Sequence, residues 1–195
     1  MPSVLTKSPA FAWQTIDYIK IVVIDWRKVI QSNPMTRELI LMRHAHAQLA
    51  DPGQLDHTRA LSPQGCIQAK AAGRWLMKHS LFPDRILCSQ ARRARETLAA
   101  MIASLGESKP LFEPNIYQAS VQSLITVLDA HVEADRVLLI GHNPSLEQLC
   151  RLLCHQQQTF PVVWSISPSS LVVLTLSAKA DRIVGGADLK MIWKP

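Results

Sequence analysis

The sequence is poor in the features that mark secreted and membrane-spanning proteins. It has only four cysteines in 195 residues. They lie far apart, except for Cys150 and Cys154, and no secretory signal pattern precedes them, so we expect reduced thiols in a cytoplasmic protein and not a disulfide framework. No uninterrupted apolar run approaches the ~20 residues that a spanning helix needs, so we expect no membrane span.

The motifs of nucleotide and metal cofactors are also missing. The sequence contains no GxxxxGKS/T loop, no glycine fingerprint of a dinucleotide-binding fold and no carboxylate cluster for Mg²⁺. Cys150, Cys154 and His155 could ligate a metal, because residues four apart share a helix face. The leucines around them favour an apolar helix face, in which a free cysteine acts as a small buried hydrophobe. We therefore expect neither a metal nor a cofactor.

The length and the charge set broad limits on the fold and the partners. A chain of 195 residues favours one domain with a real hydrophobic core. Lys and Arg exceed Asp and Glu by 21 to 15, which gives a net charge of +6. This excess suits anionic substrates, although it also serves solubility. The basic residues do not form one tail, and we expect no nucleic-acid partner.

Residues 1–34 differ in kind from the rest. They are apolar and aromatic, but Asp17, Lys20 and Asp25 interrupt them, and they lack the order of segments of a signal peptide. They could form a helix packed on the domain, a helix that binds a partner or a membrane surface, or sequence upstream of the true start, because Met35 follows directly. We predict an N-terminal extension at 1–34 without a catalytic role, and one domain at 35–195.

Strands and helices alternate along this predicted domain. Apolar runs of strand length lie at 38–42, 84–89, 136–142, 170–176 and 189–193, and helical patterns lie at 62–78, 91–106, 120–131 and 143–155. Ser62 is an expected N-cap before Pro63, and Asn143 an expected N-cap before Pro144. This alternation predicts an α/β fold, with three α/β/α layers and a mainly parallel central sheet.

Three of the predicted strands end in basic residues. In such folds ligands bind outside the carboxyl ends of the strands, and an anion is favoured at the start of the helix that follows GHNP. Each residue alone has an ordinary explanation, as a surface histidine or as an arginine on a solvated face. Together they predict an anion site. The residues at these strand ends are Arg43 and His44, then Ser89 with Arg92, Arg93 and Arg95, then Gly141 and His142.

Histidines and arginines without a metal suit one kind of chemistry, which is phosphoryl transfer through a phosphohistidine. Arginine binds phosphoryl oxygens through bidentate, charge-assisted hydrogen bonds. One imidazole attacks phosphorus with an unprotonated nitrogen, and the other can neutralise the charge on the oxygens.

The same segments resemble the motifs of the histidine phosphatase superfamily, which has the phosphoglycerate mutase-like fold. RHAHA at 43–47 resembles the RHG-type motif with Ala45 in place of glycine, SQARRARET at 89–97 the second motif, and GHNPSL at 141–146 the second histidine motif. The resemblance covers about 36–176. It implies that His44 is the nucleophile, that Arg43 and Arg93 clamp the phosphate, and that His142 is the second catalytic histidine.

Within the superfamily the chain looks most like the compact SixA-type phosphohistidine phosphatases, because of TRALSPQG at 58–65, IYQAS at 116–120 and the lack of a long insertion. Arg59 is a candidate for a further phosphate contact, or else a loop arginine in solvent. His46 is a candidate for the pocket rim, or else a surface residue. Many superfamily members use a glutamate as proton donor, and here Glu113 and Gln118 lie in the corresponding region. A missing acid would fit phosphohistidine, since its leaving imidazole has a pKa near neutrality.

Three functions are compatible with these residues. The first is a metal-independent phosphatase that removes phosphate from phosphohistidine on a protein, as in a phosphorelay. The second is a phosphatase of small phosphate esters or nucleotides, and the third is a non-catalytic adaptor that binds a phosphorylated partner. Mutase activity is disfavoured because it needs a longer lid to retain the intermediate.

Overall fold

The computed structural model describes residues 36–107, 109–154, 165–176 and 185–195. A six-stranded sheet forms its centre, in the order β3-β2-β4-β1-β5-β6. The strands are β1 (Arg37–Arg43), β2 (Arg85–Ser89), β3 (Pro110–Glu113), β4 (Arg136–Gly141), β5 (Leu171–Leu176) and β6 (Ala187–Trp193). β1, β2, β3 and β4 run parallel to their neighbours among these four, whereas β5 pairs antiparallel with both β1 and β6.

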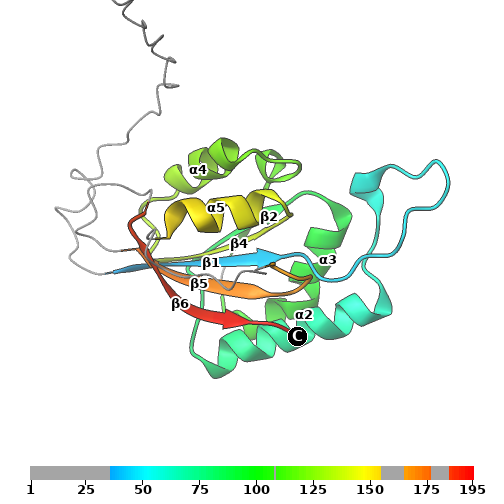
Figure 1. Ribbon diagram of the computed structural model, residues 1–195. Coiled ribbons are helices and arrows are strands. Elements are labelled where there is room, and N and C mark those ends of the chain that lie inside the picture. The colour runs from blue at the N-terminus through cyan, green and yellow to red at the C-terminus, as the bar shows by residue number, and fades with distance from the viewer. Residues whose placement is uncertain (1–35, 108, 155–164, 177–184) are drawn as a thin grey trace, which may run out of the picture.

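Helices cover both faces of the sheet (Figure 1), which confirms the predicted three-layer fold. α4 (Val121–Asp129) and α5 (Ser145–Leu153) lie on one face, and α2 (Pro63–Lys78) and α3 (Arg92–Met101) on the other. Three short 3-10 turns, η1 (Asp56–Thr58), η2 (Ile102–Ser104) and η3 (Pro114–Ile116), complete the described elements. The loop between β1 and α2 carries η1 and projects from the end of the sheet toward which β1 points.

β1 is buried on both faces, which explains its unbroken apolar sequence. Leu39 and Leu41 join the core cluster under α4 and α5. Ile40 and Met42 join the cluster under α2 and α3. Both sides of this strand are thus fixed by packing, and its carboxyl end holds a fixed position from which the chain continues into His44.

The start of α2 is fixed as predicted. The Ser62 hydroxyl accepts a hydrogen bond from the Gly65 amide at 3.0 Å, and Pro63 is the first helical residue. Gly65 lies against the loop that follows His44, because a Cβ there would be 2.1 Å from the carbonyl oxygen of His46. A side chain at position 65 would push this loop away from the helix.

Three sequence expectations need correction. Asn143 does not cap α5, which begins at Ser145; its side-chain amide donates instead to Glu147 Oε1 at 2.6 Å and to the Ile166 carbonyl at 3.0 Å. β3 was not predicted, because it is a four-residue edge strand that begins with proline. The helix predicted to Gly106 ends at Met101 and tightens into η2 before Gly106 reverses the chain with a φ of 75°.

Two further expectations fall outside the described residues, namely the N-terminal extension 1–34 and His155. Within the described part of the chain, no helix is long and apolar enough to cross a membrane. The same part holds no group of three His, Cys, Asp or Glu side chains that could bind a metal ion. The leucines and cysteines of α5 form the expected buried stripe, with Leu146, Leu149, Cys150 and Leu153 in the core.

Candidate active site

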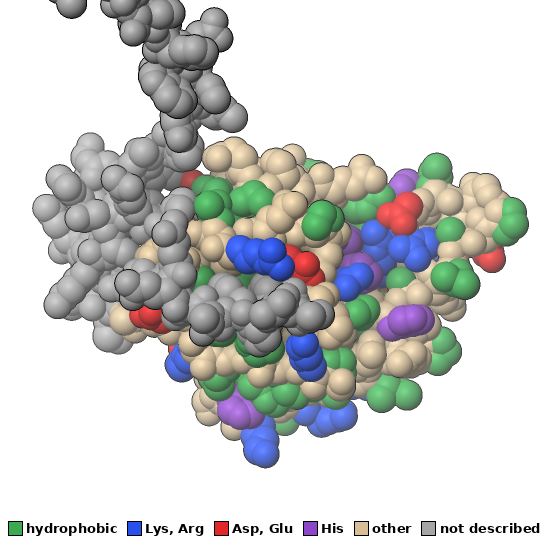
Figure 2. All heavy atoms as spheres, in the orientation of Figure 1, with side chains coloured by type: hydrophobic (Ala, Val, Ile, Leu, Met, Phe, Trp, Pro, Cys, Tyr) green, Lys and Arg blue, Asp and Glu red, His purple; other side chains and the backbone are tan. Residues whose placement is uncertain are grey.

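The carboxyl ends of β1, β2 and β4 meet at one edge of the sheet. Arg43 lies opposite Gly141 in the β1–β4 register, so the residues that follow, His44 and His142, become neighbours. Their ring centroids are 5.0 Å apart, and Arg93 at the start of α3 contacts both rings. Figure 2 shows basic and histidine side chains gathered beside acidic ones toward this end of the molecule.

The hydrogen bonds of His44 determine which of its nitrogens can react. Nδ1 lies 2.7 Å from the carbonyl oxygen of Ala45, which can only accept, so Nδ1 carries the proton. The Nε2 lone pair is therefore free of a proton and accepts a hydrogen bond from Arg93 Nε at 3.1 Å. His44 thus presents a neutral nucleophilic nitrogen to a guanidinium group.

His142 is held from two sides. Its Nδ1 lies 3.4 Å from Arg93 Nη2, and because a guanidinium only donates, Nδ1 is the accepting nitrogen. The proton is then on Nε2, which lies 2.8 Å from the Ser89 hydroxyl oxygen. The Tyr117 ring packs on His142 in a T-shaped arrangement, with centroids 5.5 Å apart. Ser89, at the end of β2, therefore orients the ring.

Both histidines are held in their neutral form. Burial and, to a lesser extent, the nearby guanidinium groups lower the pKa of His44 to about 4, although its bond to the Ala45 carbonyl opposes this shift. Burial also lowers the pKa of His142 to about 3, with contributions from His44 and Arg93. At neutral pH the positive charge in the pocket therefore comes from the arginines, and the imidazoles keep their lone pairs.

Arg43 has a donor that the fold does not satisfy. Its Nη1 donates to the Ile166 carbonyl at 3.0 Å, while its buried Nε has no hydrogen-bond partner among the described residues. Burial lowers the pKa of this guanidinium, and the carboxylate of Glu147 opposes that effect. A buried N–H without a partner costs about 1–3 kcal/mol, so an acceptor such as a phosphoryl oxygen would be favoured there.

The structure distinguishes among the three arginines of the second motif. Arg92 pairs with Glu96 on the helix surface at 2.7 Å, and Arg95 lies over the Phe112 ring at 5.3 Å. Arg93 is the one that reaches the histidines. Thr97 links both motifs, because its hydroxyl accepts from the Ala45 amide at 3.0 Å and donates to the Arg93 carbonyl at 2.7 Å.

Asp56 and Tyr117 belong to the site, although sequence reasoning missed both. Arg93 Nη2 donates to Asp56 Oδ2 at 2.9 Å, and Nη1 donates to the backbone carbonyl of Asp56 at 2.7 Å. The Tyr117 hydroxyl donates to the same carboxylate at 2.8 Å. Burial opposes ionisation of Asp56, but the hydrogen bonds from Tyr117 and Arg93 outweigh it and lower the pKa to about 2. A single loop aspartate gives no periodic signal from which this role could be predicted.

The remaining predicted residues are not among the hydrogen-bond partners of the two imidazole rings in the described part of the chain. Arg59 bonds Asp56 Oδ1 at 2.9 Å and the Gln48 carbonyl at 2.9 Å, so it braces the loop that carries Asp56; its contact with phosphate stays a prediction. His46 is exposed and bonds the Ser62 hydroxyl at 2.8 Å. Glu113 ends β3 opposite Ser89 in the register. Among the described residues, the hydrogen bonds of the two imidazole rings involve Ala45, Arg93 and Ser89, and not Glu113.

The lowered pKa values predict a loss of stability in mild acid. A histidine whose folded-state pKa lies below its unfolded value of about 6.5 stabilises the fold above pH 6.5, and this contribution is lost as the pH falls toward the folded pKa. Each such histidine changes the free energy of unfolding by up to about 1.4 kcal/mol per pH unit in this window. We expect urea denaturation to show a drop of a few kcal/mol between pH 7 and pH 5.

Histidine variants test the origin of this acid effect. His142→Asn should reduce the slope of unfolding free energy against pH by about half, because one of two protonating groups is gone. His57→Asn, which removes an exposed histidine outside the pair, is the matched control. An unchanged slope in His142→Asn would contradict the neutral buried state of this ring.

Comparisons with known proteins identify the same region. Residues 39–119 match the profile of the histidine phosphatase superfamily (branch 1). An uncharacterized chloroplastic protein of Arabidopsis thaliana is 31% identical over 133 residues, which are 63% of this chain and 61% of the plant protein. The match therefore spans less than two thirds of that relative. An uncharacterized Mycobacterium tuberculosis protein is 34% identical over 114 residues, or 57% of this chain and 69% of that protein.

Solved structures share the fold over most of the described chain. A proposed phosphohistidine phosphatase SixA from Agrobacterium tumefaciens is 25% identical with a TM-score of 0.72, and the match covers 83% of this chain and 99% of that one. A second proposed SixA, from Nakamurella multipartitia, is 29% identical with a TM-score of 0.71 and coverages of 84% and 99%. These matches agree with the layers and the sheet described above.

Proposed function

Because the chain belongs to the histidine phosphatase superfamily, we propose that it is a metal-independent phosphatase that works through a phosphohistidine intermediate and removes phosphate from phosphohistidine on a protein. The observation that carries the proposal is the neutral Nε2 of His44, which faces the guanidinium of Arg93 at 3.1 Å. This pairs a nucleophile with a donor that can bind the group under attack.

The proposed reaction has two steps. His44 Nε2 attacks phosphorus, and the bond from phosphorus to the leaving atom breaks with its electron pair going to that atom. Arg43 and Arg93 donate to the phosphoryl oxygens and stabilise the charge that develops on them. Water then attacks phospho-His44, the P–Nε2 bond breaks, and the electron pair returns to Nε2. The neutral ring of His142 is the candidate acceptor for the proton that the water loses.

Two features support a phosphohistidine substrate over a phosphate ester. An ester oxygen leaves poorly unless an acid protonates it, whereas a leaving imidazole has a pKa near neutrality. The carboxyl bound to Arg93, that of Asp56, is ionised at neutral pH because its pKa is about 2, and Glu113 is not among the polar contacts of the two imidazole rings in the described part of the chain. The two SixA structures point to the same substrate class by similarity.

The surface beside the pocket supports a protein as the carrier of the phosphate. Leu49 and Leu55, on the loop that carries Asp56, are 89% and 64% exposed. Exposed apolar side chains on the loop that also carries Asp56 favour contact with another protein. All four cysteines are free, which supports the predicted reducing, cytoplasmic setting.

The proposal is tested by turnover of a phosphohistidine-bearing protein domain beside an aryl phosphate, with EDTA present. We expect fast loss of the phosphohistidine, little ester hydrolysis and no effect of EDTA. The reverse preference would make this protein an ester phosphatase, and Glu113→Gln would then be the first variant to measure. Tight binding of the phosphorylated domain without turnover would favour the adaptor.

A further inference from the structure

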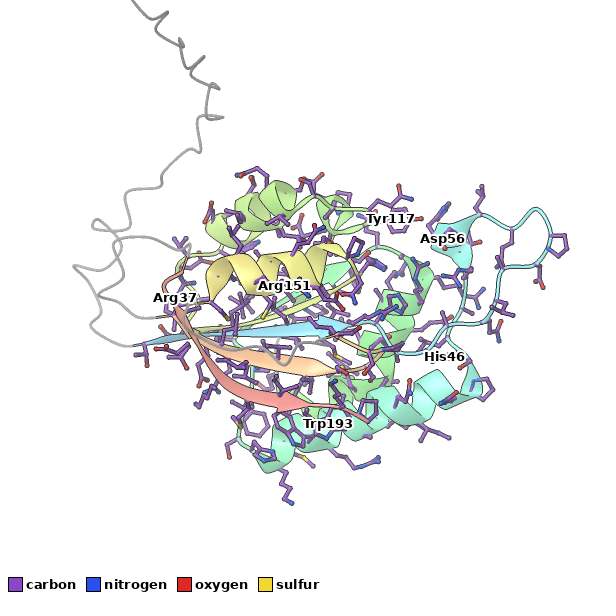
Figure 3. All side chains as sticks on the ribbon, viewed as in Figure 1. Arg37, His46, Asp56, Tyr117, Arg151 and Trp193 are labelled. Carbon is purple, nitrogen blue, oxygen red and sulfur yellow. The ribbon has the colours of Figure 1, made fainter. Side chains whose placement is uncertain are left out.

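Asp56 lies between the pocket and the solvent. Its side chain is 50% exposed, whereas the side chain of Arg93, to which it is bound at 2.9 Å, is only 6% exposed. Figure 3 shows Asp56 and Tyr117 near each other at the end of the molecule where the loop after β1 projects. Both histidines are buried, and the half-exposed Asp56 is bound to Arg93, which contacts both rings, so its carboxylate lies beside the donors that would hold the phosphoryl group.

The donors of Arg93 are divided between two directions. Nη1 and one Nη2 hydrogen point to the backbone and the carboxylate of Asp56. Nε and the other Nη2 hydrogen point to His44 Nε2 and His142 Nδ1. The donors that face the two histidines are therefore the ones that would bind phosphoryl oxygens. The donors that face Asp56 can keep their hydrogen bonds to it. Binding of the phosphoryl group does not require the Arg93–Asp56 pair to break.

Asp56 consequently remains as a negative charge at the mouth of the pocket. Tyr117 and Arg59 each donate to its carboxylate, which keeps it ionised and in place. A leaving group that carries or develops negative charge, such as an alkoxide or a phenolate, is repelled by this carboxylate. A leaving group that carries positive charge is attracted to it.

We propose that Asp56 is a specificity-determining residue that selects substrates in which the phosphorus is bound to a cationic imidazole ring, protonated on its other nitrogen. This inference rests on the proposed function, and it adds that the enzyme recognises the charge of the leaving ring as well as the phosphoryl group.

The reaction with such a substrate balances without a general acid. The phosphorylated ring arrives with a proton on the nitrogen that does not bear phosphorus. His44 Nε2 forms the new P–N bond, the old P–N bond breaks, and its electron pair goes to the leaving ring nitrogen. The ring keeps its proton and departs as neutral imidazole. Asp56 stabilises the cationic ring before and during bond cleavage, so the ring stays protonated above its free pKa of about 6.5.

Small substrates with different leaving groups test this directly. We would measure kcat/KM for phosphoimidazole and for 4-nitrophenyl phosphate between pH 5.5 and 9, with the wild type and with Asp56→Asn. The asparagine keeps an acceptor oxygen for Arg93 and Tyr117 but removes the charge. For phosphoimidazole we expect a loss of about tenfold at pH 8 and a rate that starts to fall at lower pH than in the wild type. For the aryl phosphate we expect no loss or a gain.

The controls separate charge selection from simple positioning. Asp51→Asn removes an exposed carboxylate from the same loop and should leave both substrates unchanged. Equal losses for both substrates in Asp56→Asn, with unchanged pH profiles, would overturn the proposal and leave Asp56 as a positioning residue for Arg93. A wild type that hydrolyses the aryl phosphate but not phosphoimidazole would overturn it too.

A failure of the proposal for Asp56 can be told apart from a failure of the proposed phosphatase function. Turnover of a phosphohistidine-bearing protein domain decides the proposed function, whereas the phosphoimidazole series decides the role of Asp56. A wild type that cleaves phosphoimidazole with the expected Asp56→Asn effect, yet leaves the protein domain intact, would uphold the selection by charge and reject the protein substrate.

Discussion

His44→Ala is expected to reduce kcat/KM by about 10⁴-fold or more, because the variant has no nitrogen at which the covalent intermediate could form. The fold supplies no replacement at this position, since His142 Nδ1 accepts from Arg93 and its Nε2 faces Ser89. Brief incubation of the wild type with labelled substrate should trap an acid-labile phosphate on the protein. The variant should trap none.

His46→Ala is the matched control for this variant. His46 lies two residues further along the same motif, but it is exposed and bonds Ser62, so its loss should leave the rate within a factor of about three. Urea denaturation of His44→Ala should show a cooperative transition, which separates loss of chemistry from loss of the fold. Substantial turnover in folded His44→Ala would exclude the covalent route through this residue.

The pocket combines two neutral imidazoles with two guanidinium groups, and burial is what makes this combination possible. In water a histidine would be partly protonated near pH 6.5. Here burial and the neighbouring guanidinium groups keep His44 and His142 unprotonated. The nucleophile is therefore available at the same pH at which Arg43 and Arg93 are cationic. A plateau of activity down to about pH 5 is the kinetic counterpart of the acid effect on stability.

Most of the fold could be predicted because its strands are buried on both faces. β1, β2, β4 and β5 form from continuous apolar runs, and their residues pack into the core clusters on the two faces of the sheet. β3 could not be found in this way, since as a short edge strand it is only partly buried. The cap predicted at Asn143 is wrong because α5 begins two residues later, at Ser145, and the Asn143 amide donates to Glu147 and to the carbonyl of Ile166, 23 positions away in the chain.

The same distinction holds for the site. His44, Arg93 and His142 follow predicted strands, so the position of each is set by an element that the sequence reveals. Asp56 begins η1 and Tyr117 directly follows η3, and they meet across 61 positions of the chain. No pattern in either segment reports on the other. Such partners are determined by the tertiary structure, and no local sequence pattern identifies them.

Arg93→Lys is expected to cost roughly 10²- to 10³-fold in kcat/KM, although it keeps the charge. The guanidinium uses three nitrogens at once, with Nε on His44, Nη2 on His142 and Asp56, and Nη1 on the Asp56 carbonyl. A lysine ammonium is a single centre and cannot span these partners. It would bind either the carboxylate or the phosphoryl group, and the simultaneous hydrogen bonds of the guanidinium group to both sides would be lost.

Arg92→Lys provides the comparison, because Arg92 is the adjacent arginine on the same helix and its side chain bonds Glu96 on the helix surface, away from the histidines. We expect Arg92→Lys to retain nearly the wild-type rate. Inorganic phosphate should inhibit Arg93→Lys far more weakly than either the wild type or Arg92→Lys, since the donors that face the two histidines would be missing.

A near-normal rate and normal phosphate inhibition in Arg93→Lys would mean that another arginine binds the phosphoryl group. Arg59, which bonds the other oxygen of the Asp56 carboxylate, would then be the first residue to replace.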